Sequence, residues 1–198
     1  MVDATRPQYH PSTHLLESID GYHVPVTVSG PDTGRVVIML DEAPRCLGPY
    51  ALVRERLHVA AFRIIGVHAQ AGLTPKCVVN ILDQLEVTGG LLVGDGYGGE
   101  LAWKLAATQR HRFTGMVVVD SGHPKVPGID GKVRDTHCPT VELDTTILVG
   151  TAAFDRVARA SRRYVHGEFR LVEVAGVRGS RHFTAQLTTE IVLRALSR

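Results

Sequence analysis

Hydrophobic residues fall into short continuous runs, and these runs alternate with segments of helical spacing. Continuous apolar runs are typical of strands buried on both faces of a sheet. Such runs occupy residues 35–40, 61–67, 90–94, 115–120, 145–150 and 169–175. Helical spacing covers residues 49–57, 74–87, 97–108, 153–165 and 184–196. Thr74 as an N-cap with Pro75 at the first helical position marks one helix start.

Two further apolar segments, "HLLESI" and "YHVPVTVSG", precede this series. The Asp20-Gly21 turn between them predicts an antiparallel strand pair. Strand–helix alternation then predicts an α/β fold with a mostly parallel central sheet and helices on both faces. We expect residues 1–12 to form a flexible N-terminal arm and residues 13–198 a single domain. In such sheets, ligands bind at the carboxyl ends of the strands.

Composition narrows the class of protein. The chain of 198 residues is 44% hydrophobic and 21% charged, as expected for one globular domain. A net charge of +2, with no basic stripe among aromatics, argues against nucleic-acid binding. No apolar run approaches the roughly 20 residues that span a bilayer, and the N-terminus lacks the apolar core of a signal peptide. We therefore expect no membrane association, a cytoplasmic location and, from the Arg, Ala, Val and Gly enrichment, a bacterial source.

The three cysteines, Cys46, Cys77 and Cys138, lie far apart and form no CxxC pair. A disulfide framework or a zinc site is therefore not expected. We predict no metal and no cofactor.

The stretch "LLVGDGYGGELA" at residues 91–102 places a glycine-rich turn between a strand and a helix. Gly94, Gly96 and Gly99 satisfy the G-x-G-x-x-G pattern, and Asp120 ends the next strand, where an acid meets a ribose hydroxyl. This interpretation predicts an NAD(P)-dependent oxidoreductase. Against it, the fingerprint normally lies on the first strand of its domain, whereas four or five predicted strands precede it here.

The same turn has the shape of G-x-Ser-x-G-G, in which a nucleophile occupies a strained strand-to-helix turn. "VVIML" is similar to a strand leading into an oxyanion loop, "ILVGTAAFD" to one delivering a catalytic acid, and "GSRHF" to a loop delivering a histidine. On these segments the chain resembles the α/β-hydrolase fold family along nearly its full length. The resemblance implies Asp155 as the acid and His182 as the base. The short segment between Asp120 and Asp144 implies that the family's lid domain is absent.

Two parts of the hydrolase site depart from that pattern. The nucleophile position falls on Gly96, which has no side chain, although acyl transfer needs an oxygen or sulfur there. The family usually carries His-Gly after its third strand, whereas this chain has Asp41-Glu42. Two carboxylates beside a developing oxyanion would oppose it. The two departures indicate that serine-hydrolase activity has been lost, with a natural or an engineered Gly96 both left open.

The remaining candidate residues follow from their places beside this turn. Asp120 is an alternative acid for His182, and we predict a hydrogen bond between His182 and either Asp155 or Asp120. Gly96 should have a positive φ. The side chains expected to line a ligand pocket are Asp41, Glu42, Asp95, Tyr97, Ser121 and His123.

The leading functional hypothesis is an α/β-hydrolase-like protein that binds a small molecule of unknown identity or interacts with a protein partner or a second copy of itself. The alternative is a serine-independent enzyme of the hydrolase, lyase or cofactor-free oxygenase type, in which a His182–Asp155 dyad is the general base. The NAD(P)-dependent oxidoreductase is the third hypothesis.

Overall fold

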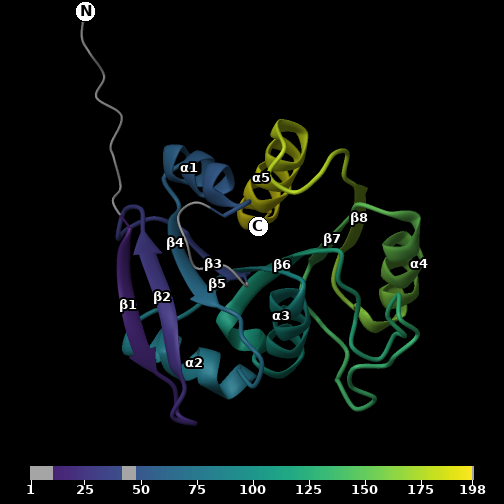
Figure 1. Cartoon of the computed structure of the whole chain (residues 1–198), viewed down its shortest axis with the longest axis horizontal. Helices are drawn as coiled ribbons and strands as arrows, with labels where there is room; N and C mark the ends of the chain where they lie inside the picture. Colours follow the sequence, from purple (N-terminus) through teal and green to yellow (C-terminus); the bar gives the residue numbers. More distant parts are fainter. Residues whose placement is uncertain (1–10, 42–47, 198) are drawn as a thin grey trace, which may run out of the picture.

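The computed structural model describes residues 11–41 and 48–197 (Figure 1). Within these residues, eight strands form one sheet: β1 (Ser12–Glu17), β2 (His23–Ser29), β3 (Val36–Asp41), β4 (Arg63–His68), β5 (Gly90–Asp95), β6 (Phe113–Val119), β7 (Thr145–Val149) and β8 (Phe169–Glu173). The α-helices are α1 (Ala51–Val59), α2 (Pro75–Gln84), α3 (Tyr97–Thr108), α4 (Ala152–Ser161) and α5 (Arg181–Leu196). Two 3₁₀ turns, η1 (Arg110–Arg112) and η2 (Arg162–Tyr164), complete the described elements.

The strand order is β1-β2-β4-β3-β5-β6-β7-β8. Strand β2 pairs antiparallel with β1 and β4, and the other neighbours pair parallel. Gly21 has φ +79° in the turn between β1 and β2, and its amide donates to the Ser18 carbonyl at 2.9 Å. The predicted hairpin and the predicted mostly parallel sheet are both confirmed.

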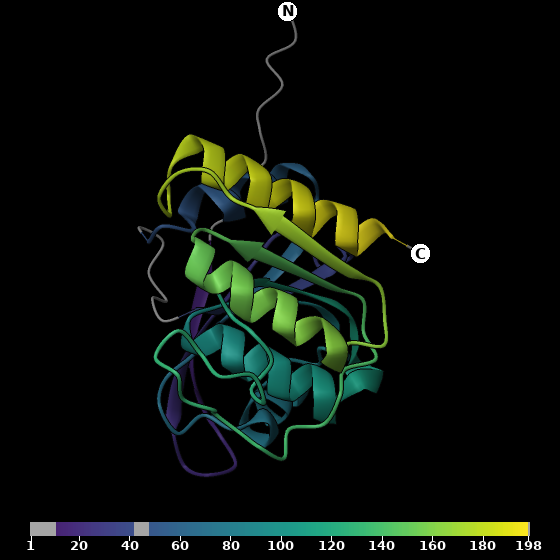
Figure 2. The ribbon, with the colours of Figure 1, turned by 90° about the vertical axis from the view of Figure 1, so that its right-hand side faces the viewer.

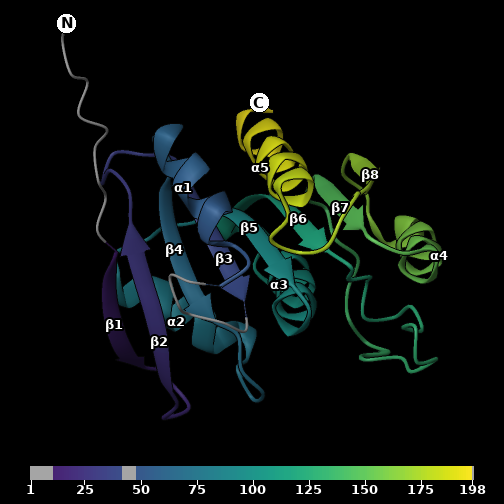
Figure 3. The same ribbon diagram turned by 45° about the horizontal axis from the view of Figure 1, so that its top comes forward.

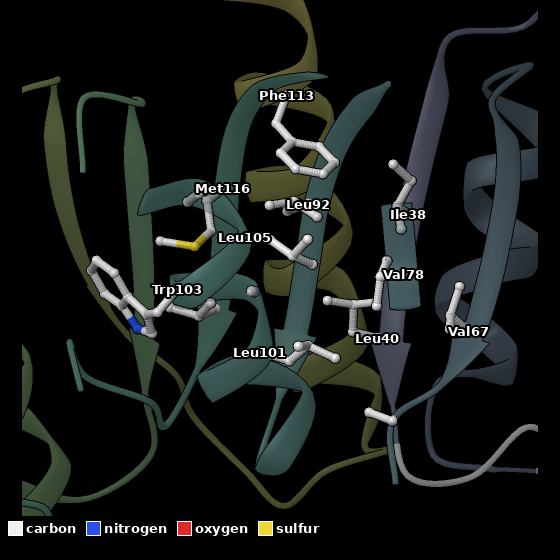
Figure 4. Close-up of a cluster of buried hydrophobic side chains, with 14 of the residues drawn as sticks. Ile38, Leu40, Val67, Val78, Leu92, Leu101, Trp103, Leu105, Phe113 and Met116 are labelled. Atoms are coloured by element: carbon white, nitrogen blue, oxygen red, sulfur yellow. The ribbon is translucent and has the colours of Figure 1, made fainter. Parts of the chain in front are cut away.

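Helices cover both faces of the sheet. Helices α1 and α5 lie side by side on one face, and α2, α3 and α4 cover the other (Figures 2 and 3). Each face has its own buried hydrophobic cluster. The cluster under α3 includes Trp103, which is fully buried beside Met116 and the α3 leucines (Figure 4). The continuous apolar runs in the central strands follow from this arrangement, because both faces of these strands are buried.

Local signals set most element boundaries. The Thr74 hydroxyl accepts a hydrogen bond from the Cys77 amide at 3.3 Å, and Pro75 begins α2, as predicted. Helix α3 spans the predicted residues 97–108. Helix α4 ends at Ser161, earlier than predicted, and η2 covers most of the remaining segment.

Helix α5 begins at Arg181, whereas we predicted a start at residue 184. The Ser180 hydroxyl accepts from the Phe183 amide at 3.2 Å and so caps the helix. Gly179, with φ +85°, turns the chain into this cap. His182 therefore lies in the first turn of α5, and not in the preceding loop.

The segment between β6 and β7, residues 120–144, is fully described and contains no helix and no strand beyond an isolated bridge from Val141 to Val165. Most of the predicted N-terminal arm, residues 1–12, lies outside the described residues. Strand β1 begins at Ser12, the last residue of that predicted arm. No helix in the part of the chain that the structure describes is long and apolar enough to cross a membrane.

Candidate functional site

Gly96 forms the sharp turn between β5 and α3. It has φ +54° and ψ −124°, a conformation that glycine adopts without the strain of a side chain. Its carbonyl accepts from the amides of Gly99 at 3.1 Å and Glu100 at 3.2 Å, which starts the helix. The predicted positive φ of Gly96 at a strand-to-helix turn is confirmed.

Close packing explains the glycines around this turn. A Cβ on Gly98 would overlap the Leu40 carbonyl of β3, and one on Gly94 would overlap the Gly98 carbonyl. A Cβ on Gly99 would lie 2.6 Å from the Cβ of Ser121. These contacts set α3 directly on β3, β5 and the loop after β6. The glycine pattern therefore has a structural cause that needs no bound phosphate.

Arg178, from the loop between β8 and α5, bridges two carboxylates beside Gly96. Its Nε and one terminal nitrogen donate to the two oxygens of Asp95, at 2.6 and 2.7 Å. The same terminal nitrogen donates to Asp120 at 3.0 Å. This planar fork matches the geometry that guanidinium and carboxylate prefer. The hydrogen bonds to Asp95 raise the pKa of Arg178 above its usual value, so the group stays protonated.

Asp120 directly follows β6 and has an unusual backbone conformation, with φ +45°. One carboxylate oxygen accepts from Arg178, and the other accepts from the Gly150 amide at 2.8 Å. The carboxylate thus ties the ends of β6 and β7 to the loop after β8. The Asp120 side chain is only 8% exposed, and among the described residues it forms no hydrogen bond with His182.

Tyr50 and Arg54 hold the other acids of the site. Tyr50, the N-cap of α1, donates its hydroxyl proton to Asp95, and burial and the Asp95 charge raise the pKa of Tyr50. Arg54 of α1 forms an ion pair with Asp41 at the end of β3. Burial raises the pKa of Asp41 above its usual value, although Arg54 acts in the opposite direction. Both pairs fix α1 against the carboxyl edge of the sheet.

The described residues enclose one small cavity between these side chains. A cavity bordered by Asp41, Tyr50 and Asp95 has a volume of about 10 Å³. That volume holds about one water molecule. Glu42, which we predicted beside Asp41, lies outside the described residues.

His182 stands apart from both predicted acids. Its side chain is exposed on the first turn of α5. Asp155, in the first turn of α4, accepts from Arg159 Nε at 2.8 Å, and Asp120 is engaged as described above. Among the described residues, no hydrogen bond joins His182 to either acid, so the predicted bond does not form.

Of the remaining predicted pocket residues, His123 lies in the core and Ser121 packs against the start of α3. His123 is 1% exposed, and its ring stacks on Tyr164 with centroids 4.5 Å apart and meets the Trp103 ring edge-on at 5.3 Å. It is therefore a core residue, a correction to the predicted pocket role. Ser121 packs against Gly99, and its carbonyl accepts from Trp103 Nε1 at 3.3 Å.

Tyr97 follows Gly96 and packs against the cluster under α3. With Lys104 and Glu100 it borders a separate cavity of about 160 Å³ between the starts of α2 and α3. The predicted site residues that the structure brings together are thus Asp41, Asp95, Gly96 and Asp120.

Sequence reasoning missed Tyr50, Arg54 and Arg178. The segment "GSRHF" points to His182, whereas the residue of the loop after β8 that contacts Asp95 is Arg178. The signal that points to Arg178 is its place between Gly176 and Gly179, whose φ values of +87° and +85° shape the loop. No comparable pattern marks Tyr50 or Arg54. Within residues 11–41 and 48–197, no group of three His, Cys, Asp or Glu side chains could hold a metal ion.

Comparison with known proteins yields structural matches only. No protein-family model matches the sequence, and no curated protein matches it. Epoxide hydrolase A from Mycobacterium thermoresistibile superposes with a TM-score of 0.73 at 10% identity, covering 95% of this chain and 98% of that one. A hydrolase from Pseudomonas aeruginosa PA01 gives 0.72 at 15% identity, with coverage of 95% and 98%. Est1E from Butyrivibrio proteoclasticus gives 0.70 at 13% identity, with coverage of 95% and 99%.

The sheet order, the elbow-shaped turn at Gly96 and these neighbours together establish the α/β-hydrolase fold. At such low identity, the likeness concerns the fold and not the activity.

Proposed function

We propose that this α/β-hydrolase-fold protein is a pseudoenzyme, without serine-hydrolase activity, that acts by binding a small molecule or a protein partner. One observation carries the proposal. Gly96 lies at the apex of the turn. Arg178, from the loop between β8 and α5, forms ion pairs with Asp95 and Asp120 beside this turn.

Acyl transfer on this fold needs a nucleophile and a neutral base that removes its proton. Gly96 supplies no attacking atom. Arg178 cannot serve as the base, because a guanidinium remains protonated in proteins and has no acceptor nitrogen. Both requirements are therefore unmet by the described residues closest to the turn.

The loop after β3, where the oxyanion would form, supports the loss of activity less strongly than the sequence implied. Asp41 is buried, but its charge is balanced by Arg54. The carboxylate opposes an oxyanion less when it is paired than when it is alone. The case for lost activity thus rests on Gly96 and Arg178 more than on Asp41.

No observation favours either of the two enzyme hypotheses, the general-base enzyme or the oxidoreductase. The general-base hypothesis needs His182 oriented by an acid, and that contact does not form. The oxidoreductase hypothesis needs a free acid at the end of β6, and both oxygens of Asp120 are engaged. A binding role is compatible with an ionic cluster that is already complete, because such groups need no rearrangement to present a fixed surface.

Ester hydrolysis tests this proposal. We expect the natural protein to hydrolyse p-nitrophenyl acetate no faster than its His182→Ala variant. Gly96→Ser should add less than about tenfold, because a serine without a base gains little of the roughly 10²–10⁴-fold from proton transfer. Gly96→Ala is the matched control for the added Cβ.

Two results would contradict the proposal. Turnover by the natural protein that disappears in His182→Ala would establish a serine-free enzyme. Turnover by Gly96→Ser well above that of Gly96→Ala would show that a base already faces residue 96. Circular dichroism of each variant excludes loss of folding as the cause of inactivity.

A further inference from the structure

A larger cavity lies at the opposite edge of the sheet, where the parallel strands begin. Its volume is about 450 Å³, within the range of small-molecule sites. The start of β3, the loop into β5, η1, the start of β6 and the end of α5 surround it. The polar side chains among its described lining are Arg35, Thr88, His111, Arg112 and Thr114.

The described lining carries positive charge and no carboxylate. Arg112 is anchored, since it donates to Asp83 at 2.7 Å and to the Val87 carbonyl at 2.8 Å. Arg35 donates to the Ala195 carbonyl at 2.6 Å, and it forms no ion pair with a described residue. A guanidinium has five N–H donors, so the bond to Ala195 leaves most of those of Arg35 for a ligand.

Backbone irregularity places a hydroxyl at the same edge. In the pairing of β5 with β6, Gly90 lies opposite Phe113 and Leu91 lies opposite Gly115, so Thr114 has no partner residue. Such bulges redirect a side chain and recur beside functional sites. Thr114 is exposed, as is Thr88 across the cavity.

The main chain of Gly89 and Gly90, which line this cavity, packs closely against neighbouring segments. A Cβ on Gly90 would lie 2.5 Å from the Val36 carbonyl, and one on Gly89 would overlap the Arg112 carbonyl. Larger residues would therefore force the strands apart. The two glycines keep the cationic and hydroxyl groups around one compact hollow.

We propose that this amino-edge cavity binds a phosphorylated small molecule, with Arg35 as the principal charged contact and Thr114 as a hydroxyl donor. Guanidinium groups bind phosphate oxygens through paired hydrogen bonds, and hydroxyls complete such sites. The volume admits a phosphate together with a body of several carbon atoms. The site is at the edge away from Gly96, so it holds whether or not the ester-hydrolysis test fails.

Phenyl phosphate is a suitable probe, with phenylacetate as a carboxylate of similar size. We expect saturable shifts of the amide signals of residues 88–91 and 111–114 in ¹H–¹⁵N spectra. Phenyl phosphate should bind more tightly than phenylacetate and more weakly as ionic strength rises.

Variants then assign the contacts. Arg35→Gln should weaken binding at least about tenfold, or about 1.4 kcal/mol. Thr114→Val, which keeps the shape and removes the hydroxyl, should weaken it about threefold. Arg156→Gln is the matched control, because Arg156 is an exposed arginine on α4 and does not line this cavity.

Thermal melting shows whether each variant remains folded. Because Arg35→Gln also removes the bond to Ala195, Thr114→Val provides an independent test. The proposal is overturned if no saturable shift appears at phenyl phosphate concentrations up to about 10 mM. A specific site of this kind should have a lower dissociation constant than that concentration. It is equally overturned if phenylacetate binds as tightly, if the shifts map elsewhere, or if folded Arg35→Gln binds unchanged.

Discussion

At the residue scale, one arginine bridges two carboxylates beside Gly96. Arg178 is the described cation that contacts both Asp95 and Asp120. The two carboxyl side chains are only 16% and 8% exposed, so neither can regain full hydration if the cation is removed. Tyr50 would still donate to Asp95, whereas Asp120 would keep only the Gly150 amide. The loop after β8 should therefore loosen when Arg178 is lost.

We predict that Arg178→Ala lowers the free energy of unfolding by about 1–3 kcal/mol. Breaking a buried pair costs roughly 3–5 kcal/mol, and the value is discounted here because Arg178 is 42% exposed. Urea denaturation gives the measurement. Arg159→Ala removes the exposed i,i+4 pair with Asp155 and should leave the free energy of unfolding nearly unchanged. Equal losses in both variants would contradict a bridging role for Arg178.

At the element scale, most strands and helices could be predicted because their signals are local. Buried strands show as continuous apolar runs, and Thr74 with Pro75 marks the start of α2. The start of α5 was missed because Ser180, its cap, precedes a helix with little hydrophobic periodicity. His182 therefore lies on α5, and Arg178 is the charged residue of the preceding loop that contacts Asp95. Contacts such as that of Arg178 with Asp95 join residues distant in the sequence, and no local sequence pattern predicts them.

The segment between β6 and β7 has a definite anchor although it forms no regular element. His123 Nε2 lies 2.8 Å from the Pro139 carbonyl, and Nδ1 accepts from the Lys125 amide at 3.2 Å. An accepting Nδ1 and a donating Nε2 require the neutral ring. Burial lowers the pKa of His123, in agreement with this state. The ring thus holds both arms of the segment against Trp103.

This anchor predicts a pH dependence of stability. The pKa of His123 in the folded chain lies below its value of about 6.5 in the unfolded chain. As the pH falls through this range, the unfolded chain therefore binds more protons than the folded chain. The stabilisation is complete at a pH well above that value and declines as the pH falls through it. His58 also has a pKa lowered by burial, so the natural protein alone does not isolate one histidine.

His123→Gln isolates the effect. It should be less stable than the natural protein at about pH 8, and the difference should shrink towards about pH 5, where protonation removes the advantage of His123. Urea midpoints across this range give the comparison. A difference that stays constant with pH would mean that His123 stabilises the segment only through ring packing.

At the scale of the whole molecule, one sheet connects two hydrophobic cores. Trp103 and the side chains of α3 pack on one face, whereas Leu187 and the side chains of α5 pack on the other. Strands such as β5 and β6 contribute residues to both clusters, with Leu91 and Leu92 facing opposite ways. Loss of either core leaves one face of the same strands uncovered. The described chain should therefore unfold as one unit, which is the sense in which we propose a single domain.

Leu187→Ala tests this coupling from the face opposite the reporter. Leu187 is fully buried, so its truncation should cost about 2–5 kcal/mol. Trp103 is the sole tryptophan and is also fully buried, so its emission should shift to longer wavelength on unfolding. In a cooperative domain, the urea midpoint from Trp103 emission should fall by the same amount as that from far-ultraviolet circular dichroism. Leu193→Ala, an exposed leucine of the same helix, should leave both midpoints nearly unchanged. If Leu187→Ala shifts the dichroism midpoint while that of Trp103 emission stays in place, the two faces unfold separately and the single-domain proposal is wrong.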